Sequence, residues 1–154
     1  MTKPTISPFA EWVTASDESL TGDPLWSVQA YRLGMYAIAC HSADRRAVTA
    51  LATSAALDQI TRAIGSVAAN IAEGYSRSSI TDRNRFYGYA LGSAREAIAW
   101  YDTVRVEIGD LATERQATLI QVRRLLLTTL RRARSESALA AFSDPTRKST
   151  RDDP

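Results

Sequence analysis

Hydrophobic residues recur every three or four positions over four long stretches of this chain. That spacing places them along one face of a helix, whereas a half-buried strand alternates with a period of two. No stretch competes as a strand. We therefore expect an all-α protein, built as an antiparallel up-down-up-down four-helix bundle. The most regular stripe consists of Leu57, Ile60, Ile64, Val67, Ile71 and Tyr75.

Residues that start and stop helices set the expected limits of the first two long helices. Asp23 followed by Pro24 is a capping residue before a proline, which is a typical helix start. The first long helix is expected from about Leu25 to His41 or beyond, and the polar connection over 42–54 is expected to be helical in part. Gly74 is expected to end the second helix, because glycine favours the backbone of a helix C-cap.

Similar signals set the limits of the other two helices. Thr81 or Asp82 is expected to cap the third helix, which then runs to Gly109. Thr113 is expected to cap the fourth helix, with Gln116 three residues later completing a capping box.

The chain divides into three parts. Residues 1–22 are expected to form an arm with at most one short helix, whose aromatic residues Phe9 and Trp12 dock on another surface. Residues 23–134 form the bundle. Residues 135–154 lose the apolar pattern and are expected to be a disordered C-terminal tail.

The basic side chains are unevenly distributed, although the formal net charge is only +2. Residues 115–134 contain six arginines and no acid. Such a surface favours an anionic partner, RNA or DNA. The alternatives are that these arginines pair with acids of a neighbouring subunit or lie along the bundle with their stems packed. The candidate nucleic-acid contacts are Arg123, Arg124, Arg131 and Arg134.

The N-terminal sequence lacks the apolar core of a signal peptide, and no run approaches the ~18 apolar residues of a membrane span. The single cysteine, Cys40, permits no intrachain disulfide. We therefore expect a soluble cytoplasmic protein with no membrane partner.

Catalytic chemistry has little support in the sequence. His41 is the only histidine, and its neighbour Cys40 points about 100° away on a helix, which is poor geometry for a Cys–His pair. No metal-ligand spacing, glycine-rich phosphate loop or Ser/His/Asp set is present. We expect no enzyme activity and no cofactor.

Two further patterns bear on assembly. A polar stripe lies opposite the apolar face of the second helix; it is either a solvated face or a half-buried seam against another helix. A second apolar stripe on the third helix (Tyr87, Leu91 and Ile98) and one on the fourth (Ile120 and Leu127) have no expected place inside one bundle. They predict subunit contacts, and therefore a homo-oligomer. The polar stripe consists of Gln59, Arg62, Ser66, Asn70 and Glu73.

Residues 57–74, LDQITRAIGSVAANIAEG, carry a family resemblance together with Arg77 and Ser79 in the loop. Phe86, the block ALGS at 90–93, Glu96 and Trp26 extend it. The chain resembles the four-helix-bundle proteins first noticed in intervening sequences of bacterial large-subunit rRNA genes. It departs from the family pattern at Ala68, where proline is usual, and at Arg83, where an aromatic residue is usual.

The resemblance implies an antiparallel four-helix bundle that assembles as a ring-shaped homopentamer. It also implies similarity to the accessory proteins of diversity-generating retroelements, which work with a reverse transcriptase and its RNA. No enzyme activity is established for the family at large.

The polar residues of the motif are expected to form a cluster that fixes helix ends and loop geometry, also across a subunit boundary. Glu73 lies at the end of a helix, where a carboxylate opposes the helix dipole, and therefore needs Arg77 or Arg62 as a partner. A ligand site and a plain solvated surface are the alternatives. The expected set is Gln59, Arg62, Ser66, Asn70, Glu73, Arg77, Ser93 and Glu96.

These observations predict a non-enzymatic oligomeric bundle, expected to be pentameric, that binds nucleic acid through a basic surface. The alternative is a scaffold or adaptor that binds another protein through its N-terminal arm.

Overall fold

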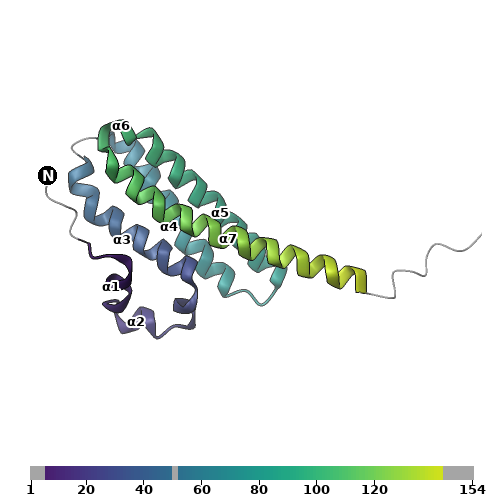
Figure 1. Cartoon of the computed structure of the whole chain (residues 1–154). Helices are drawn as coiled ribbons and strands as arrows, with labels where there is room; N and C mark the ends of the chain where they lie inside the picture. Colours follow the sequence, from purple (N-terminus) through teal and green to yellow (C-terminus); the bar gives the residue numbers. More distant parts are fainter. Residues whose placement is uncertain (1–5, 50–51, 144–154) are drawn as a thin grey trace, which may run out of the picture.

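The computed structural model describes residues 6–49 and 52–143. The regular secondary structure within these residues is entirely helical, with no strand, which confirms the predicted all-α class. Figure 1 shows the long helices side by side, with successive helices running in opposite directions. They are α3 (Gln29–Thr49), α4 (Ser54–Tyr75), α5 (Ile80–Thr103) and α7 (Asp110–Ser143).

Each long helix packs mainly on two others, in the cyclic order α3, α4, α5, α7. One core cluster, with Ile60, Ile64 and Leu119, fills the half of the bundle near the α3–α4 connection. A second, with Val67 and Tyr87, fills the half near the α4–α5 loop. Because the apolar stripe of α4 runs through both clusters, this helix ties the two halves together.

The N-terminal arm folds back on the bundle. It contains α1 (Phe9–Thr14), α2 (Glu18–Thr21) and the 3-10 turn η1 (Pro24–Ser27). The rings of Phe9 and Trp12 each lie 5.4 Å from the ring of Tyr36 on α3, centroid to centroid. Trp12 also lies 5.9 Å from Trp26 of η1. The arm's aromatic residues therefore dock on their own chain.

The first long helix begins later than the sequence predicted and continues past His41, as the prediction allowed. The side chain of Asp23 accepts a 2.7 Å hydrogen bond from the backbone N–H of Leu25, so it caps η1 rather than a long helix. At Val28 the backbone is extended, which separates η1 from α3. The helix then continues to Thr49, through most of the segment that was expected to be a partly helical connection.

Gly74 does not end the second helix. It is buried inside α4, and Ser76, not a glycine, is the C-cap of that helix. A Cβ at position 74 would lie 2.8 Å from the ring of Tyr87 and 3.1 Å from the carbonyl oxygen of Arg83. The glycine is therefore needed for the close approach of α4 to α5 rather than for a turn.

Two predicted caps were also wrong. Ser79, rather than Thr81 or Asp82, caps α5 by accepting from the backbone N–H of Asp82 at 3.4 Å. The third helix ends at Thr103 and is followed by the short α6 (Arg105–Ile108). Gly109 has a φ of 57°, so the chain turns there and α7 begins at once, which leaves the expected capping pair, Thr113 and Gln116, inside that helix.

The last helix is longer than predicted. It runs to Ser143, so residues 135–143, which were assigned to a disordered tail, are helical. Alanines at 138, 140 and 141 favour a helix there without an apolar stripe to bury. Figure 1 shows this end of α7 projecting beyond the other helices. The rest of the predicted tail, 144–154, lies outside the described residues.

Apart from the half-buried Ile120, the residues of the second apolar stripes lie in the core of the bundle or pack against it, contrary to expectation. Tyr87 and Leu91 are buried in the core, and Ile98 and Leu127 pack against it. The reason is that α5 and α7 each have two neighbouring helices, so a broad face of each is covered within one chain. These residues therefore give no independent argument for subunit contacts.

Within residues 6–49 and 52–143, no helix has the combined length and apolarity needed to cross a bilayer.

Candidate functional site

The centre of the motif's polar stripe is a half-buried seam between α4 and α5. The hydroxyl of Ser93 on α5 donates to the hydroxyl of Ser66 on α4 at 3.0 Å. The amide nitrogen of Asn70 donates to the backbone carbonyl of Ser66 at 2.8 Å and lies 3.0 Å from its hydroxyl. Of the two alternatives left open for the stripe, the half-buried seam therefore holds for Ser66 and Asn70.

The other members of the predicted set lie apart from this seam. Gln59 is half-buried, whereas Arg62 and Glu96 are exposed. In the described part of the chain, no hydrogen bond or ion pair connects these three side chains to Ser66, Asn70 or Ser93. The structure thus divides the predicted cluster instead of assembling it.

Glu73 and Arg77 form the pair that the helix end required. They are ion-paired across one helical turn, at the point where α4 passes into the loop. The guanidinium of Arg77 lies over the ring of Phe86, 5.0 Å from its centroid. Arg83 donates to the backbone carbonyl of Arg77 at 3.1 Å. These contacts fix the loop to the start of α5, as the sequence predicted for this part of the motif.

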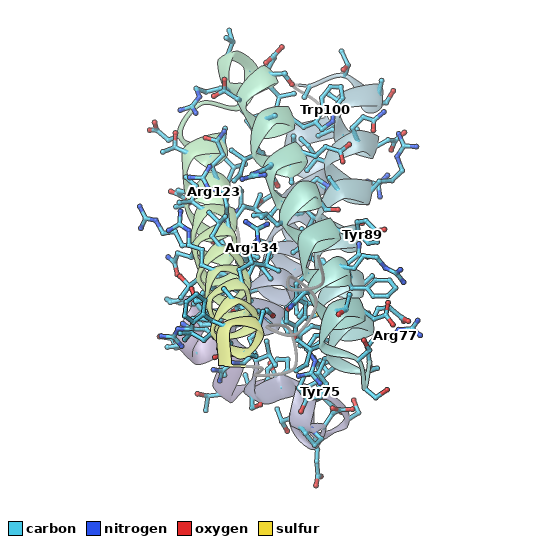
Figure 2. The ribbon with its side chains drawn as sticks, turned by 90° about the vertical axis from the view of Figure 1, so that its right-hand side faces the viewer. Tyr75, Arg77, Tyr89, Trp100, Arg123 and Arg134 are labelled. Carbon is cyan, nitrogen blue, oxygen red and sulfur yellow. The ribbon has the colours of Figure 1, made fainter. Side chains whose placement is uncertain are left out.

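Aromatic and arginine side chains gather on the surface beside this loop. The rings of Phe86 and Tyr89 meet edge to face, 5.8 Å apart, and Arg85 lies 5.6 Å from the Phe86 centroid. The exposed fraction is 53% for Tyr89 and 37% for Tyr75. Figure 2 shows Arg77 and Tyr89 on one side of the molecule, whereas Tyr75 lies lower, towards the middle of the view. We call this surface the aromatic–arginine corner; it consists of Arg77, Arg83, Arg85, Phe86 and Tyr89.

The sequence analysis missed the corner because Phe86 stands in register with the apolar stripe of α5. Its ring is only half-buried in the structure. The signal that could have revealed the corner is the interleaving of four aromatic residues with three arginines over residues 75–89. That pattern is common on surfaces that bind nucleic acid.

The four arginines predicted as nucleic-acid contacts lie on α7. Arg124, Arg131 and Arg134 are exposed, and Arg123 is half-buried. At 100° per residue, Arg124 and Arg131 differ in direction by about 20°, as do Arg123 and Arg134. Figure 2 shows Arg123 and Arg134 on α7. Among the described residues, none of the four belongs to an ion pair.

A buried ion pair connects α3 to the first half of α7. Two nitrogens of the Arg115 guanidinium donate to the two carboxylate oxygens of Asp44, at 2.5 and 3.1 Å. Only 8% of Arg115 and 3% of Asp44 are exposed. Burial disfavours the charged form of Arg115, but the hydrogen-bonded carboxylate outweighs it and raises the arginine's pKa.

His41 lies in the same buried region. One ring nitrogen is 3.1 Å from the hydroxyl of Tyr101, and the other is 2.8 Å from the hydroxyl of Thr61. Burial lowers the pKa of His41 and raises the pKa of Tyr101 and of the Cys40 thiol. The neutral imidazole therefore serves as a hydrogen-bonding link inside the core.

Sequence reasoning missed this buried network, although a signal existed. Asp44 stands four residues after Cys40 and four before Val48, on the buried face of α3. Arg115 likewise stands four residues before Leu119, on the buried face of α7. One acid and one base at core positions of neighbouring helices indicate a buried pair, because an isolated buried charge is very costly.

No group of three or more His, Cys, Asp or Glu residues that could hold a metal ion is found where the structure describes the chain.

Comparison with known proteins gives a family and a fold. A sequence model of the family described as "23S rRNA-intervening sequence protein" matches residues 45–124. A crystal structure of a protein of unknown function from the S23 ribosomal protein family, from Bacteroides thetaiotaomicron, matches with a TM-score of 0.60. The two chains are 18% identical, and the match covers 66% of this chain and 97% of that one. No curated protein matches the chain.

Proposed function

The chain belongs to the 23S rRNA-intervening sequence protein family, and from that premise we propose that it is a non-catalytic, oligomeric, cytoplasmic protein that binds RNA or DNA through the arginines of α7.

The observation that carries this proposal is the exposed basic surface of α7. Residues 115–134 contain six arginines and no acid, and only Arg115 is used inside the bundle. The remaining five are spread over a helix that Figure 1 shows along one side of the bundle. Guanidinium groups bind phosphate through paired hydrogen bonds, and a row of them follows a nucleic-acid backbone.

Self-association is part of the proposal, with five subunits as the resemblance implies. Large apolar side chains remain exposed at several places, including Ile80 at 63%, Val106 at 94% and Phe142 at 95%. Light scattering tests the assembly: the proposal expects five times the 16.9 kDa of one chain. A species of 16.9 kDa would overturn the oligomer but leave nucleic-acid binding open to its own test.

Binding is tested by titrating salt against a labelled RNA or DNA strand. The logarithm of the affinity should fall linearly with the logarithm of the salt concentration, with a slope of about 0.7–0.9 for each phosphate contact. Replacing Arg123, Arg124, Arg131 and Arg134 with alanine should reduce that slope by about 3. A matched pair of single substitutions serves as the control: Arg124→Ala on α7 and Arg62→Ala at an exposed arginine on α4. An unchanged slope in the fourfold variant would sink the proposal.

The alternative function, an adaptor that binds a protein through its N-terminal arm, has a weaker basis. The aromatic residues that made the arm look like a docking element pack on Tyr36 and Trp26 of the same chain. What the arm leaves at the surface is mainly acidic: Glu11, Asp17 and Glu18 are exposed. Removing residues 1–22 and repeating a pull-down tests this alternative, since a partner bound by the arm should be lost.

A further inference from the structure

We propose that the aromatic–arginine corner is a stacking site for an unpaired nucleobase, so that the nucleic acid bound by this protein is single-stranded at that point. The inference rests on the proposed nucleic-acid function and adds to it a second surface and a substrate class. No residue of the corner lies on α7.

The corner offers aromatic faces of the kind on which bases stack. About half of the Tyr89 side chain is exposed. Phe86 supports Tyr89 from the side through its edge-to-face contact at 5.8 Å. An exposed tyrosine held by a second ring can accept a base with little loss of side-chain freedom, because its rotamer is already restricted.

The corner is held rigid from beneath. Arg77 is fixed over Phe86 and ion-paired with Glu73, and Arg83 is bonded to the backbone of Arg77. Just below, α4 and α5 approach so closely that Gly74 leaves no room for a side chain against Tyr87. A binding surface built on two closely packed helices keeps its shape in the absence of a ligand.

The charge of the corner favours a phosphate next to the stacked base. Three arginines, Arg77, Arg83 and Arg85, outnumber the two acids of this region. The acids are each already ion-paired, Glu73 with Arg77 and Asp82 with Arg85. The Nε–H of Arg83 is buried without a hydrogen-bond partner among the described residues. The corner also adjoins the first turn of α5, where the positive end of a long helix dipole attracts an anion.

The position of the corner fits a strand that also reaches α7. Leu126 and Leu130 of α7 pack in the same core cluster as Tyr87, so the arginines that follow them lie at this end of the bundle. Figure 2 shows Arg134 on α7, and Tyr89 and Arg77 towards the opposite edge of the view. A strand that places phosphates along α7 and one base on Tyr89 therefore has to cross this end of the bundle.

Fluorescence anisotropy with two labelled oligonucleotides tests the inference on the full chain. One is an oligothymidine, and the other is a strand of equal length with abasic sites, which keeps the phosphates but has no bases to stack. The wild type should bind the oligothymidine at least about 5-fold more tightly than the abasic strand. Tyr89→Ala should remove most of that difference and leave binding of the abasic strand unchanged.

Two variants separate stacking from other effects. Tyr89→Phe keeps an aromatic face and should retain the preference for the oligothymidine. Arg62→Ala removes an exposed side chain of α4 that does not belong to the corner, and should leave the ratio of the two affinities unchanged. Circular dichroism of each variant checks that it folds.

Equal wild-type affinity for the two strands would overturn the stacking site, while a salt-dependent slope would still uphold the α7 surface. If Tyr89→Ala instead lowers the molar mass by light scattering and leaves the base preference intact, the corner is a contact between protein chains, and the inference is wrong. Binding to neither strand would overturn both the inference and the proposed nucleic-acid function.

Discussion

The two halves of α7 use the same amino acid in opposite ways. In the first half, Arg115 is buried and donates from Nε and one terminal nitrogen of its guanidinium to Asp44 on α3. In the second half, Arg131 and Arg134 are exposed on a helix that extends past the bundle. The difference lies in desolvation: a buried guanidinium must have its partner inside the chain, whereas an exposed one remains available to an outside anion.

The largest expected effect comes from removing one arginine from each half of α7 and comparing the two losses of stability. Arg115→Ala leaves the carboxylate of Asp44 buried without its partner, and should lower the free energy of unfolding by about 3–5 kcal/mol. Arg131→Ala should change it by no more than about 0.5 kcal/mol, because it removes an exposed side chain. Urea unfolding followed by circular dichroism measures both, and similar losses in the two variants would refute the contrast.

A double variant shows how much of the Arg115→Ala loss is the cost of an orphaned charge. Replacing Asp44 with leucine and Arg115 with methionine removes both charges and keeps the core filled. Because buried ion pairs can be exchanged for apolar groups at little cost, this variant should be clearly more stable than Arg115→Ala alone. A loss as large as that of the single variant would mean that the pair itself is strongly stabilising.

Two glycines of α4 give a second contrast between a crowded and an open position. In Gly74→Ala the new Cβ would lie 2.8 Å from the ring of Tyr87, and we expect a net loss of about 1–2 kcal/mol despite the better helix propensity of alanine. A Cβ at Gly65 meets no atom within 4 Å, so Gly65→Ala should stabilise the protein by about 0.5–1 kcal/mol. Thermal unfolding of both variants decides whether close packing, rather than a turn, requires Gly74.

The pH dependence of stability tests the buried network around Arg115. The pKa of His41 is lowered in the folded state from its usual 6.5, mainly by burial, although Asp44 acts in the opposite direction. As pH falls below 6.5, the unfolded chain takes up a proton that the folded chain does not. The stabilisation by neutral His41 is therefore complete above that pH and is lost as the pH drops towards the folded-state value.

The loss should not exceed about 1.4 kcal/mol per pH unit, which is the limit for one titrating group. Urea unfolding midpoints of the wild type and of His41→Asn are measured at pH 7.5 and pH 5.5. The difference between the two proteins removes the effect of the carboxylates, which titrate in both. Parallel pH curves for the two proteins would show that His41 is not held neutral by the fold.

The sequence predicted the parts of the molecule that depend on local periodicity. The stripe Ile60, Ile64, Val67 and Ile71 is buried as expected, and the long helices pack in the predicted order. The ion pair between Glu73 and Arg77 was also expected, because a carboxylate at a helix C-terminus needs compensation.

What the sequence did not reveal depends on contacts between distant segments. Asp44 and Arg115 are 71 residues apart, so their pairing appears only when α3 and α7 are placed side by side. Gly74 looked like a helix stop because its neighbour across the helix interface, Tyr87, is not visible in local sequence. Tyr87 and Leu91 were assigned to subunit contacts because the sequence does not show how broad a face of α5 is buried by its neighbouring helices.

The smallest expected effect concerns the end of α7. Residues 135–142 are all exposed, so ending the chain after Arg134 removes little of the buried surface that the structure describes. The free energy of unfolding should change by less than about 0.5 kcal/mol, whereas binding through Arg123, Arg124, Arg131 and Arg134 should persist with the same salt dependence. Urea unfolding and a salt titration of the shortened chain measure the two quantities. A marked loss of stability would mean that the projecting end of α7 is covered in the assembled protein. The contrast between a buried arginine in the first half of α7 and exposed arginines in the second half would then no longer hold.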